Sequence, residues 1–211
     1  LGGSKIIFQI PVFQRNYEWG TSQCKQLFED LEIVAKTRVD HFIGTVVYSS
    51  EPGDKMVRIY RVIDGQQRLI TLTLLLKALS EVDHDDSQEI LDEYLMNRYV
   101  DTNRHFKLWP IPHDYEAFEF IMGGAVDDEI IHEMPSKLFD NYNLFKGLIK
   151  ESKFISAQLY QALNKFMLVY IELNDGITGE DPQAIFESLN STGVSLSSSD
   201  LVRNFLLMRP N

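Results

Sequence analysis

A long apolar stretch of the chain begins directly after a strongly polar turn. From Leu69 to Leu79 nearly every position is apolar or threonine, and the apolar residues point all around the helical period instead of along one stripe. This pattern predicts a helix that is buried in the protein core. The preceding Val62-Ile63 is typical of the end of a strand, so Asp64-Gly65-Gln66-Gln67-Arg68 is expected to form a sharp turn into that helix.

Runs of β-branched and aromatic residues predict strands elsewhere in the chain. Two of them, 42–48 and 57–63, are joined by a Pro-Gly segment, which predicts an antiparallel hairpin whose second strand leads into the polar turn. A short run at 5–10 predicts a further strand. The run at 166–173 is apolar enough to be an inner strand of the sheet.

Helical spacing of apolar residues predicts the remaining elements. The expected helices cover 21–36, with Thr21 or Ser22 as the N-cap, and then 88–99, 115–122, 136–149, 157–164, 181–189 and a last helix that ends at 207. Residues 109–112, Trp-Pro-Ile-Pro, are expected to form an extended connector. The fold class is therefore α+β, with a small mixed sheet and a central buried helix. The core would comprise 1–85 and 166–211, and 86–165 would be a large helical insertion that covers or extends the sheet.

The polar turn is a candidate anion site. The first N–H groups of a buried helix lack internal partners and lie at the positive end of its dipole. Arg68 would then contact a phosphate, and Gly65 would let the backbone approach it closely. Gln66 or Gln67 would orient a water or an oxygen, and Asp64 would hold a metal or a ribose hydroxyl. In the alternative interpretation these residues are structural, with Asp64 capping the helix and pairing with Arg68.

Two other polar segments are candidates for the same site. The loop at 13–20 combines aromatic residues with Gln14 and Arg15; alternatively, its aromatic residues simply pack this arm onto the core. The turn at 190–200 offers Asn190 and Asp200 as ligand-binding residues. Alternatively, the residues of the turn at 190–200 only cap the ends of the two flanking helices.

Composition and charge narrow the possible functions. The 211 residues are 44% hydrophobic, enough for one compact core, and no apolar run is long enough to span a bilayer, so we expect a soluble protein without a membrane partner. The chain has a single cysteine, which excludes an internal disulfide and fits a reducing interior, so a cytoplasmic location is expected. The net charge of -11 argues against binding nucleic acid through a general basic surface. The single cysteine, Cys24, is expected to pack in the core. The chain starts without methionine and stops just after a predicted helix, which suggests the N-terminal part of a longer protein.

Three separated motifs resemble one family in order along the chain. They are Ile10-Pro11-Val12-Phe13-Gln14-Arg15-Asn16-Tyr17-Glu18-Trp19, Val62-Ile63-Asp64-Gly65-Gln66-Gln67-Arg68-Leu69-Ile70-Thr71-Leu72, and Phe186-Glu187-Ser188-Leu189-Asn190-Ser191-Thr192-Gly193 continuing to Asp200-Leu201. Phe42-Ile43-Gly44-Thr45 also resembles a strand of that family. The family is the GmrS-type domain that opens GmrSD-like modification-dependent restriction enzymes and SspE-like phosphorothioation-sensing defence proteins.

The resemblance implies a ParB/sulfiredoxin-like fold and a nucleoside triphosphate site. If the roles of the family's motif apply to the matching residues here, Asp64, Gln67 and Arg68 would be catalytic, and Gly65 and Gln66 would bind the nucleotide. Gln14, Arg15, Asn190 and Asp200 match the other polar motifs and would complete the nucleotide site. Asp64 or Asp200 would supply a carboxylate to Mg²⁺.

The resemblance also implies partners that this chain does not contain. Family members usually pair this domain with an HNH-type nuclease, and no His-Asn-His pattern is found among the five histidines. We therefore expect DNA cutting in a further domain or a partner chain, modified DNA to be engaged by the full-length protein, and an NTPase or regulatory role here. The alternatives are a nucleotide- or modified-DNA-binding module without hydrolysis, and a metal-dependent nuclease that uses Asp64 and Asp200.

Overall fold

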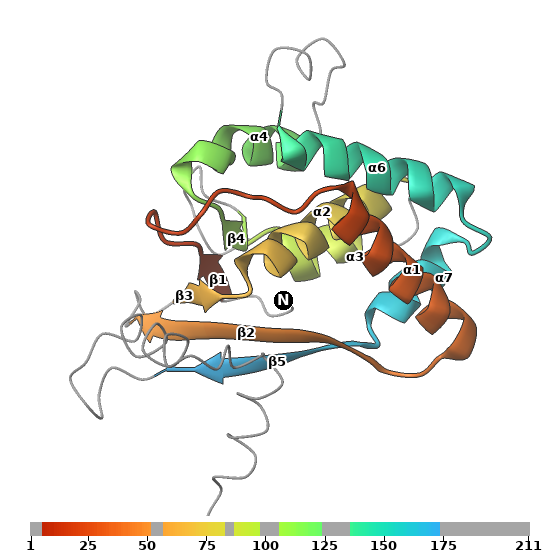
Figure 1. Cartoon of the computed structure of the whole chain (residues 1–211), viewed down its shortest axis with the longest axis horizontal. Helices are drawn as coiled ribbons and strands as arrows, with labels where there is room; N and C mark the ends of the chain where they lie inside the picture. Colours follow the sequence, from red (N-terminus) through yellow and green to blue (C-terminus); the bar gives the residue numbers. More distant parts are fainter. Residues whose placement is uncertain (1–5, 52–56, 83–86, 98–105, 124–135, 174–211) are drawn as a thin grey trace, which may run out of the picture.

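The structure, a computed structural model, describes residues 6–51, 57–82, 87–97, 106–123 and 136–173 (Figure 1). The first part of this range contains both strands and helices, and helices dominate the middle. In chain order the elements are β1 (Ile6–Gln9), α1 (Thr21–Thr37), β2 (His41–Glu51), β3 (Arg58–Asp64), α2 (Gln66–Val82), α3 (Ser87–Ile90), η1 (Leu91–Leu95), β4 (Leu108–Trp109), α4 (Pro112–Gly123), α6 (Lys137–Glu151), α7 (Ser156–Leu163) and β5 (Phe166–Glu172).

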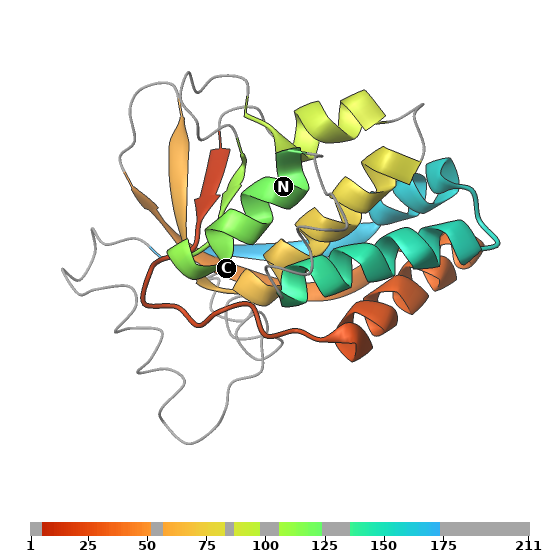
Figure 2. The ribbon, with the colours of Figure 1, turned by 90° about the horizontal axis from the view of Figure 1, so that it is seen from above.

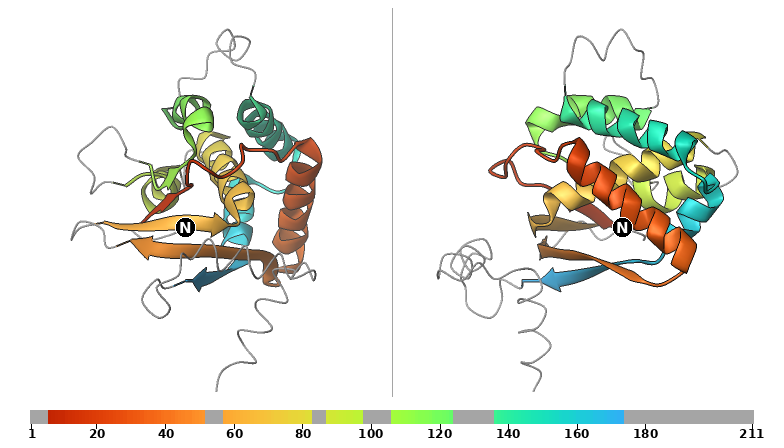
Figure 3. Two further views of the ribbon diagram at one scale, coloured as in Figure 1. Left: turned by 60° about the vertical axis from the view of Figure 1, so that its left-hand side comes forward. Right: turned by 45° about the vertical axis from the view of Figure 1, so that its right-hand side comes forward.

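The strands of the described residues form one mixed sheet in the order β4-β1-β3-β2-β5. β1 is parallel to β3 and to β4, β2 is antiparallel to β3, and β2 is parallel to β5. Figure 3 shows α2, α4 and α6 on one side of this sheet. The predicted α+β class and the β2–β3 hairpin are confirmed, and the arrangement is compatible with a ParB/sulfiredoxin-like fold.

The predicted central helix is α2, and it is buried on every side. All its residues from Gln66 to Ser80 are buried except Arg68, which is half-buried. The helix lies in the middle of the helical layer and packs against α3, α6 and α7 (Figure 2). Each fully buried leucine of α2 contributes roughly 1.5–3 kcal/mol relative to an exposed position. The position of α2 is therefore fixed by apolar contacts, and its polar first turn is fixed with it.

The helices of the predicted insertion share the core of α2. Buried side chains of α4, α6 and α7, among them Phe118, Tyr142 and Leu159, belong to the same apolar cluster as the leucines of α2. This region therefore covers the sheet indirectly. Its helices α6 and α7 pack on both α2 and α1. The insertion boundaries at 86 and 165 stay a prediction.

The prediction for the last strand is wrong, and the predicted connector at 109–112 is shorter than expected. The run at 166–173 forms β5, which is the end strand of the sheet and not an inner one, because only its β2 side is paired among the described residues. Its Met167 and Tyr170 are exposed accordingly. The predicted connector at 109–112 is confirmed only for Pro110 and Ile111, because Trp109 belongs to β4 and Pro112 begins α4. Trp109 is drawn into the sheet because its carbonyl accepts a hydrogen bond of 2.9 Å from Ile10 N.

The predicted cap of α1 is also corrected. Gly20 is the N-cap, and neither Thr21 nor Ser22 caps the helix, because Gln23 Oε1 reaches back to accept a hydrogen bond of 3.0 Å from Gly20 N. The helix predicted at 88–99 appears as α3 and η1 and ends at Leu95. The helices predicted at 181–189 and up to 207 lie outside the described residues.

Candidate functional site

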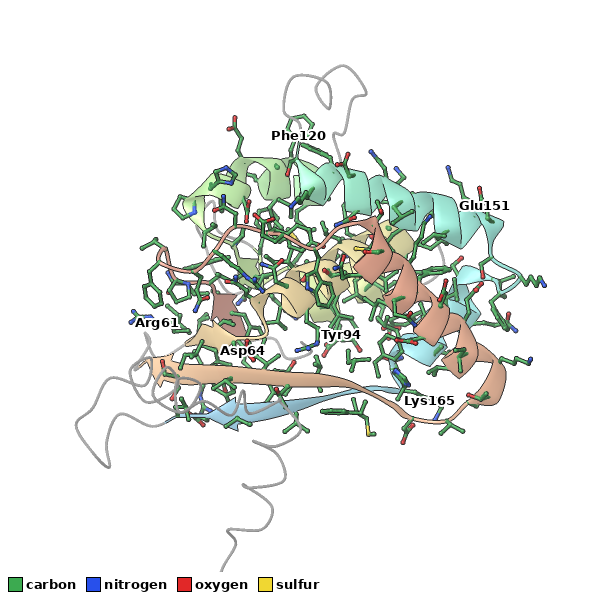
Figure 4. All side chains as sticks on the ribbon, in the orientation of Figure 1. Arg61, Asp64, Tyr94, Phe120, Glu151 and Lys165 are labelled. Atoms are coloured by element: carbon green, nitrogen blue, oxygen red, sulfur yellow. The ribbon has the colours of Figure 1, made fainter. Side chains whose placement is uncertain are left out.

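The polar turn lies where β3 ends and α2 begins. Asp64 is the last residue of β3 and Gln66 the first of α2, and Figure 4 shows Asp64 at this junction. The turn opens onto a cavity of about 240 Å³. The cavity is lined by Gln14, Arg15, Trp19, Ile63, Asp64, Gly65, Gln66, Gln67 and Arg68. The structure thus brings the first and second sequence motifs together in one cleft.

Gly65 brings the start of α2 close to β2. Its φ of +92° lies in the region that favours glycine. A Cβ atom at this position would come within 2.8 Å of the Thr45 carbonyl oxygen. Any larger residue would therefore be strained and would push the first turn of α2 away from the sheet.

Arg68 is held against the same segment of β2. Its Nη1 donates a hydrogen bond of 2.7 Å to the Thr45 carbonyl oxygen, and its guanidinium covers Gly44, whose φ is +122°. Burial lowers the pKa of the Arg68 guanidinium, while the nearby Asp64 carboxylate acts in the opposite direction. Arginine still keeps its charge, because its ordinary pKa is so high. The hydrogen bond to Thr45 uses one of its five N–H donors.

Gln66 and Gln67 hold the loop that leads from β1 to α1. Gln66 Nε2 donates to the Arg15 carbonyl at 3.0 Å, and Gln67 Nε2 donates to the Asn16 carbonyl at 2.9 Å. Gln67 Oε1 accepts hydrogen bonds from the backbone N–H groups of Glu18 and Trp19, at 2.7 and 3.1 Å. Both glutamines are only 5% exposed. Their amides therefore fix the shape of the opposite wall of the cleft.

The loop contributes Gln14 and Arg15 to the cavity. Gln14 Nε2 donates a hydrogen bond of 3.0 Å to the Ile63 carbonyl, which ties the loop to the end of β3. The Arg15 side chain is exposed at the mouth of the cleft. Two guanidinium groups, from Arg15 and Arg68, therefore line a small cavity in an otherwise acidic chain. Asn190 and Asp200, which were predicted for the same site, lie outside the described residues.

Tyr17 anchors the loop to the helical layer. Its hydroxyl is hydrogen-bonded to Thr71 Oγ1 at 2.7 Å and accepts a hydrogen bond of 3.0 Å from Asn141 Nδ2. Its backbone N–H donates to Asp114 Oδ2 at 2.8 Å. Burial raises the pKa of the Tyr17 hydroxyl, so it stays protonated and able to donate. The packing role considered for the aromatic residues of this loop applies to Tyr17, whereas Phe13 is 62% exposed.

Sequence reasoning missed several residues that shape the cleft. Asp114 and Asn141 belong to the predicted insertion, and nothing in their local sequence indicates that they hold a loop 97 and 124 residues away. The carbonyl group of Thr45 was missed because backbone acceptors leave no signal in a sequence. Gly44 did leave one, since it belongs to the Phe42-Ile43-Gly44-Thr45 motif.

Further cavities lie in the described part of the chain. One of about 300 Å³ shares Trp19 and Arg68 with the cleft and extends between α1 and β2. A larger one of about 560 Å³ lies between the β1–β4 edge and α4 and is lined mostly by apolar and aromatic side chains such as Trp109 and Tyr115. The cavity of about 560 Å³ shares no lining residue with the cleft. We place the candidate site at the cleft of about 240 Å³, because the charged groups converge there.

The cleft could accept a metal ion through one carboxylate. Asp64 is the only carboxylate among the described residues that line it. Within the described ranges, no three His, Cys, Asp or Glu side chains gather as a metal-binding group. This donor set suits Mg²⁺, which is commonly held by one or two carboxylates together with substrate phosphates.

Comparison with known proteins identifies the family. A family model described as the N-terminal domain of the GmrSD restriction endonuclease matches residues 1–207. The chain belongs to the GmrSD N-terminal domain family. The resemblance based on the sequence motifs is thereby confirmed, and this GmrSD-type domain is a domain of a restriction system. A search of curated proteins finds no match to it.

Among the described helices, none combines the length and the apolar character that crossing a bilayer requires. Even α2, the most deeply buried helix, has 17 residues and carries Lys77 and Glu81.

Proposed function

We propose that this domain binds a nucleoside triphosphate in the cleft between the β1–α1 loop and α2, and hydrolyses it to regulate DNA restriction. The observation that carries the proposal is the combination of a core helix with an open, polar N-terminus. From Leu69 to Ser80 every residue of α2 is buried, mostly by apolar packing, yet the first turn faces a cavity of about 240 Å³. Structural capping alone does not require such a cavity.

The groups in the cleft suit phosphate oxygens. The first N–H groups of α2 point out of the helix at the positive end of its dipole. Arg68 adds a planar guanidinium that is already oriented by Thr45 and Gly44, and Arg15 adds a second positive charge at the mouth. An oriented guanidinium loses less conformational freedom on binding than a mobile one. Asp64 would hold Mg²⁺, which would neutralise part of the triphosphate charge.

Gln67 is better suited to positioning the loop than to orienting a water. Its oxygen accepts two backbone hydrogen bonds and its nitrogen donates a third, so a direct role in hydrolysis would require these bonds to break. This observation favours a second candidate function, in which the domain binds a nucleotide as a switch without hydrolysing it. In that case the nucleotide would act by changing the loop that Gln66 and Gln67 hold.

We further propose that DNA cleavage is carried out elsewhere in the restriction protein. An HNH-type nuclease domain or partner chain would cut the DNA, and modified DNA would be engaged by the full-length protein. A nuclease role for this domain, with Asp64 and Asp200 as metal ligands, remains a separate proposal. Metal-dependent nicking of DNA by the purified chain would support it.

The test of the main proposal is steady-state phosphate release by the purified chain. Arg68→Lys keeps the charge but removes the planar fork, so we expect release to fall by about 10- to 100-fold. Arg58→Lys, an exposed arginine on β3 outside the cleft, is the matched control and should retain full activity. Thermal unfolding of both variants checks that the fold is intact.

Phosphate release, measured together with a nucleotide-binding titration, separates the two candidate functions. Full turnover in a folded Arg68→Lys or Arg68→Ala variant would contradict the proposed site. Tight nucleotide binding by the unsubstituted chain without phosphate release, with or without modified DNA, would instead support the binding switch.

A further inference from the structure

The second cavity is a direct continuation of the candidate nucleotide cleft. It has a volume of about 300 Å³ and lies between α1 and the beginning of β2. Trp19 and Arg68 line both cavities, so these two side chains form the boundary between them. The remaining lining residues are Gln23, Gln26, Leu27, Asp30, His41, Phe42 and Ile43.

We infer that this second cavity is the nucleoside subsite, which holds the sugar and base of the nucleotide whose phosphates occupy the first. The inference rests on the proposed function. Size is its first support, because small-molecule sites usually have volumes of about 300–1,000 Å³. The first cavity, at about 240 Å³, lies below that range, and only the two together lie well within it.

The chemical difference between the two cavities is the second support. The first is lined by amides, guanidinium groups and a helix N-terminus, which suit phosphate. The second contains apolar surface from Leu27, Phe42 and Ile43 next to polar side chains of α1. A nucleoside has the same division, with flat faces that stack on apolar and aromatic groups and edges that form hydrogen bonds.

The polar side of the cavity presents a hydrogen-bonding carboxylate. Gln26 Nε2 donates to Asp30 Oδ1 at 3.1 Å, and His41 Nε2 lies 3.6 Å from Asp30 Oδ2. These contacts orient Asp30, whose side chain is 25% exposed and keeps accepting capacity. The hydroxyl groups of a sugar and the N–H groups of a base are donors that this carboxylate would accept.

Trp19 is held in place at the junction. Its backbone N–H donates to Gln67 Oε1 at 3.1 Å, and its carbonyl accepts a hydrogen bond of 2.8 Å from Asn141 Nδ2. Gln67 belongs to the turn that would bind the phosphates. Gln67 therefore fixes the position of Trp19, which lines the nucleoside cavity, relative to the phosphate cavity.

The experiment compares a nucleoside triphosphate with inorganic triphosphate, both titrated calorimetrically into the purified chain. Phe42→Ala removes apolar surface from the second cavity, and Asp30→Asn removes its carboxylate at nearly constant shape. We expect each variant to weaken nucleoside triphosphate binding by about tenfold and to leave inorganic triphosphate binding unchanged. Met167→Ala is the matched control, because Met167 is the register partner of Phe42 on β5, is similarly exposed and lines neither cavity.

The outcomes distinguish this inference from the proposed function. If both variants bind the nucleoside triphosphate as the unsubstituted chain does, the nucleoside subsite is overturned while phosphate binding stands. If the unsubstituted chain binds neither the nucleoside triphosphate nor inorganic triphosphate, the proposed function fails and the subsite fails with it.

Discussion

Two glycines determine how the Arg68 side chain faces the cleft: Gly44 on β2 and Gly65 in the turn between β3 and α2. Gly65 lets α2 begin against the Thr45 carbonyl, and Gly44 leaves space for the guanidinium that reaches the same carbonyl. Both have positive φ angles, so both positions would strain other residues. The contact between Gly44 and Arg68 joins residues 24 positions apart. Gly44 and Arg68 each belong to a motif that the sequence reveals, but the sequence does not indicate that the two residues are in contact.

Gly44→Ala should displace the Arg68 side chain. The added Cβ would lie 2.5 Å from the guanidinium carbon, and the backbone conformation itself would be strained. We expect a loss of about 1–3 kcal/mol in the free energy of unfolding, together with weaker nucleotide binding. Denaturant unfolding and a binding titration measure the two effects.

Gly147→Ala on α6 is the control for this substitution. A Cβ at Gly147 has no neighbour within 4 Å, so the change should stabilise the helix by about 0.5–1 kcal/mol and leave nucleotide binding unchanged. Equal effects of the two substitutions would show that the contact between Gly44 and Arg68 is unimportant.

At the level of elements, α2 organises its neighbours through polar contacts at both ends. Its first turn holds the β1–α1 loop through Gln66 and Gln67. Its last turn carries Glu81, which contacts α6. The apolar pattern was enough to predict that α2 is buried. It could not predict these two contacts, because side-chain hydrogen bonds to a distant backbone depend on the tertiary fold and not on local spacing.

Gln67→Ala should loosen the β1–α1 loop. The substitution leaves the N–H groups of Glu18 and Trp19 without their acceptor, so hydrogen exchange at these two amides should become faster. Gln88→Ala, an exposed glutamine that donates to Asp92 at 2.9 Å, serves as the control and should leave exchange at these amides unchanged. Unaltered exchange at both amides in Gln67→Ala would contradict the role of this glutamine in positioning the loop.

Glu81→Gln should make the free energy of unfolding less dependent on pH in the acidic range. Burial opposes the charged form of Glu81, but hydrogen bonds from Tyr142 and Lys77 and the nearby Lys146 outweigh it and lower the pKa of this carboxyl. A lowered pKa in the folded state stabilises the protein above the unfolded value of about 4.3, and this contribution is lost as the pH falls through the folded value.

At pH 7 we therefore expect Glu81→Gln to reduce the free energy of unfolding by about 1–2 kcal/mol. The difference from the unsubstituted chain should shrink as the pH falls below about 4. Glu151→Gln, at the exposed end of α6 in Figure 4, should have little effect at either pH. A destabilisation by Glu81→Gln that is independent of pH would contradict the ion-pair account.

At the level of the whole molecule, one core supports a cleft made of segments far apart in sequence. The hairpin, the strand that enters the polar turn and the buried helix were predictable, because each depends on local periodicity. The edge position of β5 and the pairing of Trp109 with β1 were not, because the order of strands in a sheet depends on tertiary contacts. The cleft likewise combines a predictable turn with a loop whose shape is set by α2, α4 and α6.

The most direct test of this account is an experimental structure of the chain with a non-hydrolysable nucleoside triphosphate. The account predicts phosphate oxygens within hydrogen-bond distance of Arg68 and of the first N–H groups of α2, in the cleft that Gln14 and Arg15 also line. A nucleotide whose phosphates lie elsewhere, for example in the apolar cavity beside Trp109 and Tyr115, would contradict it.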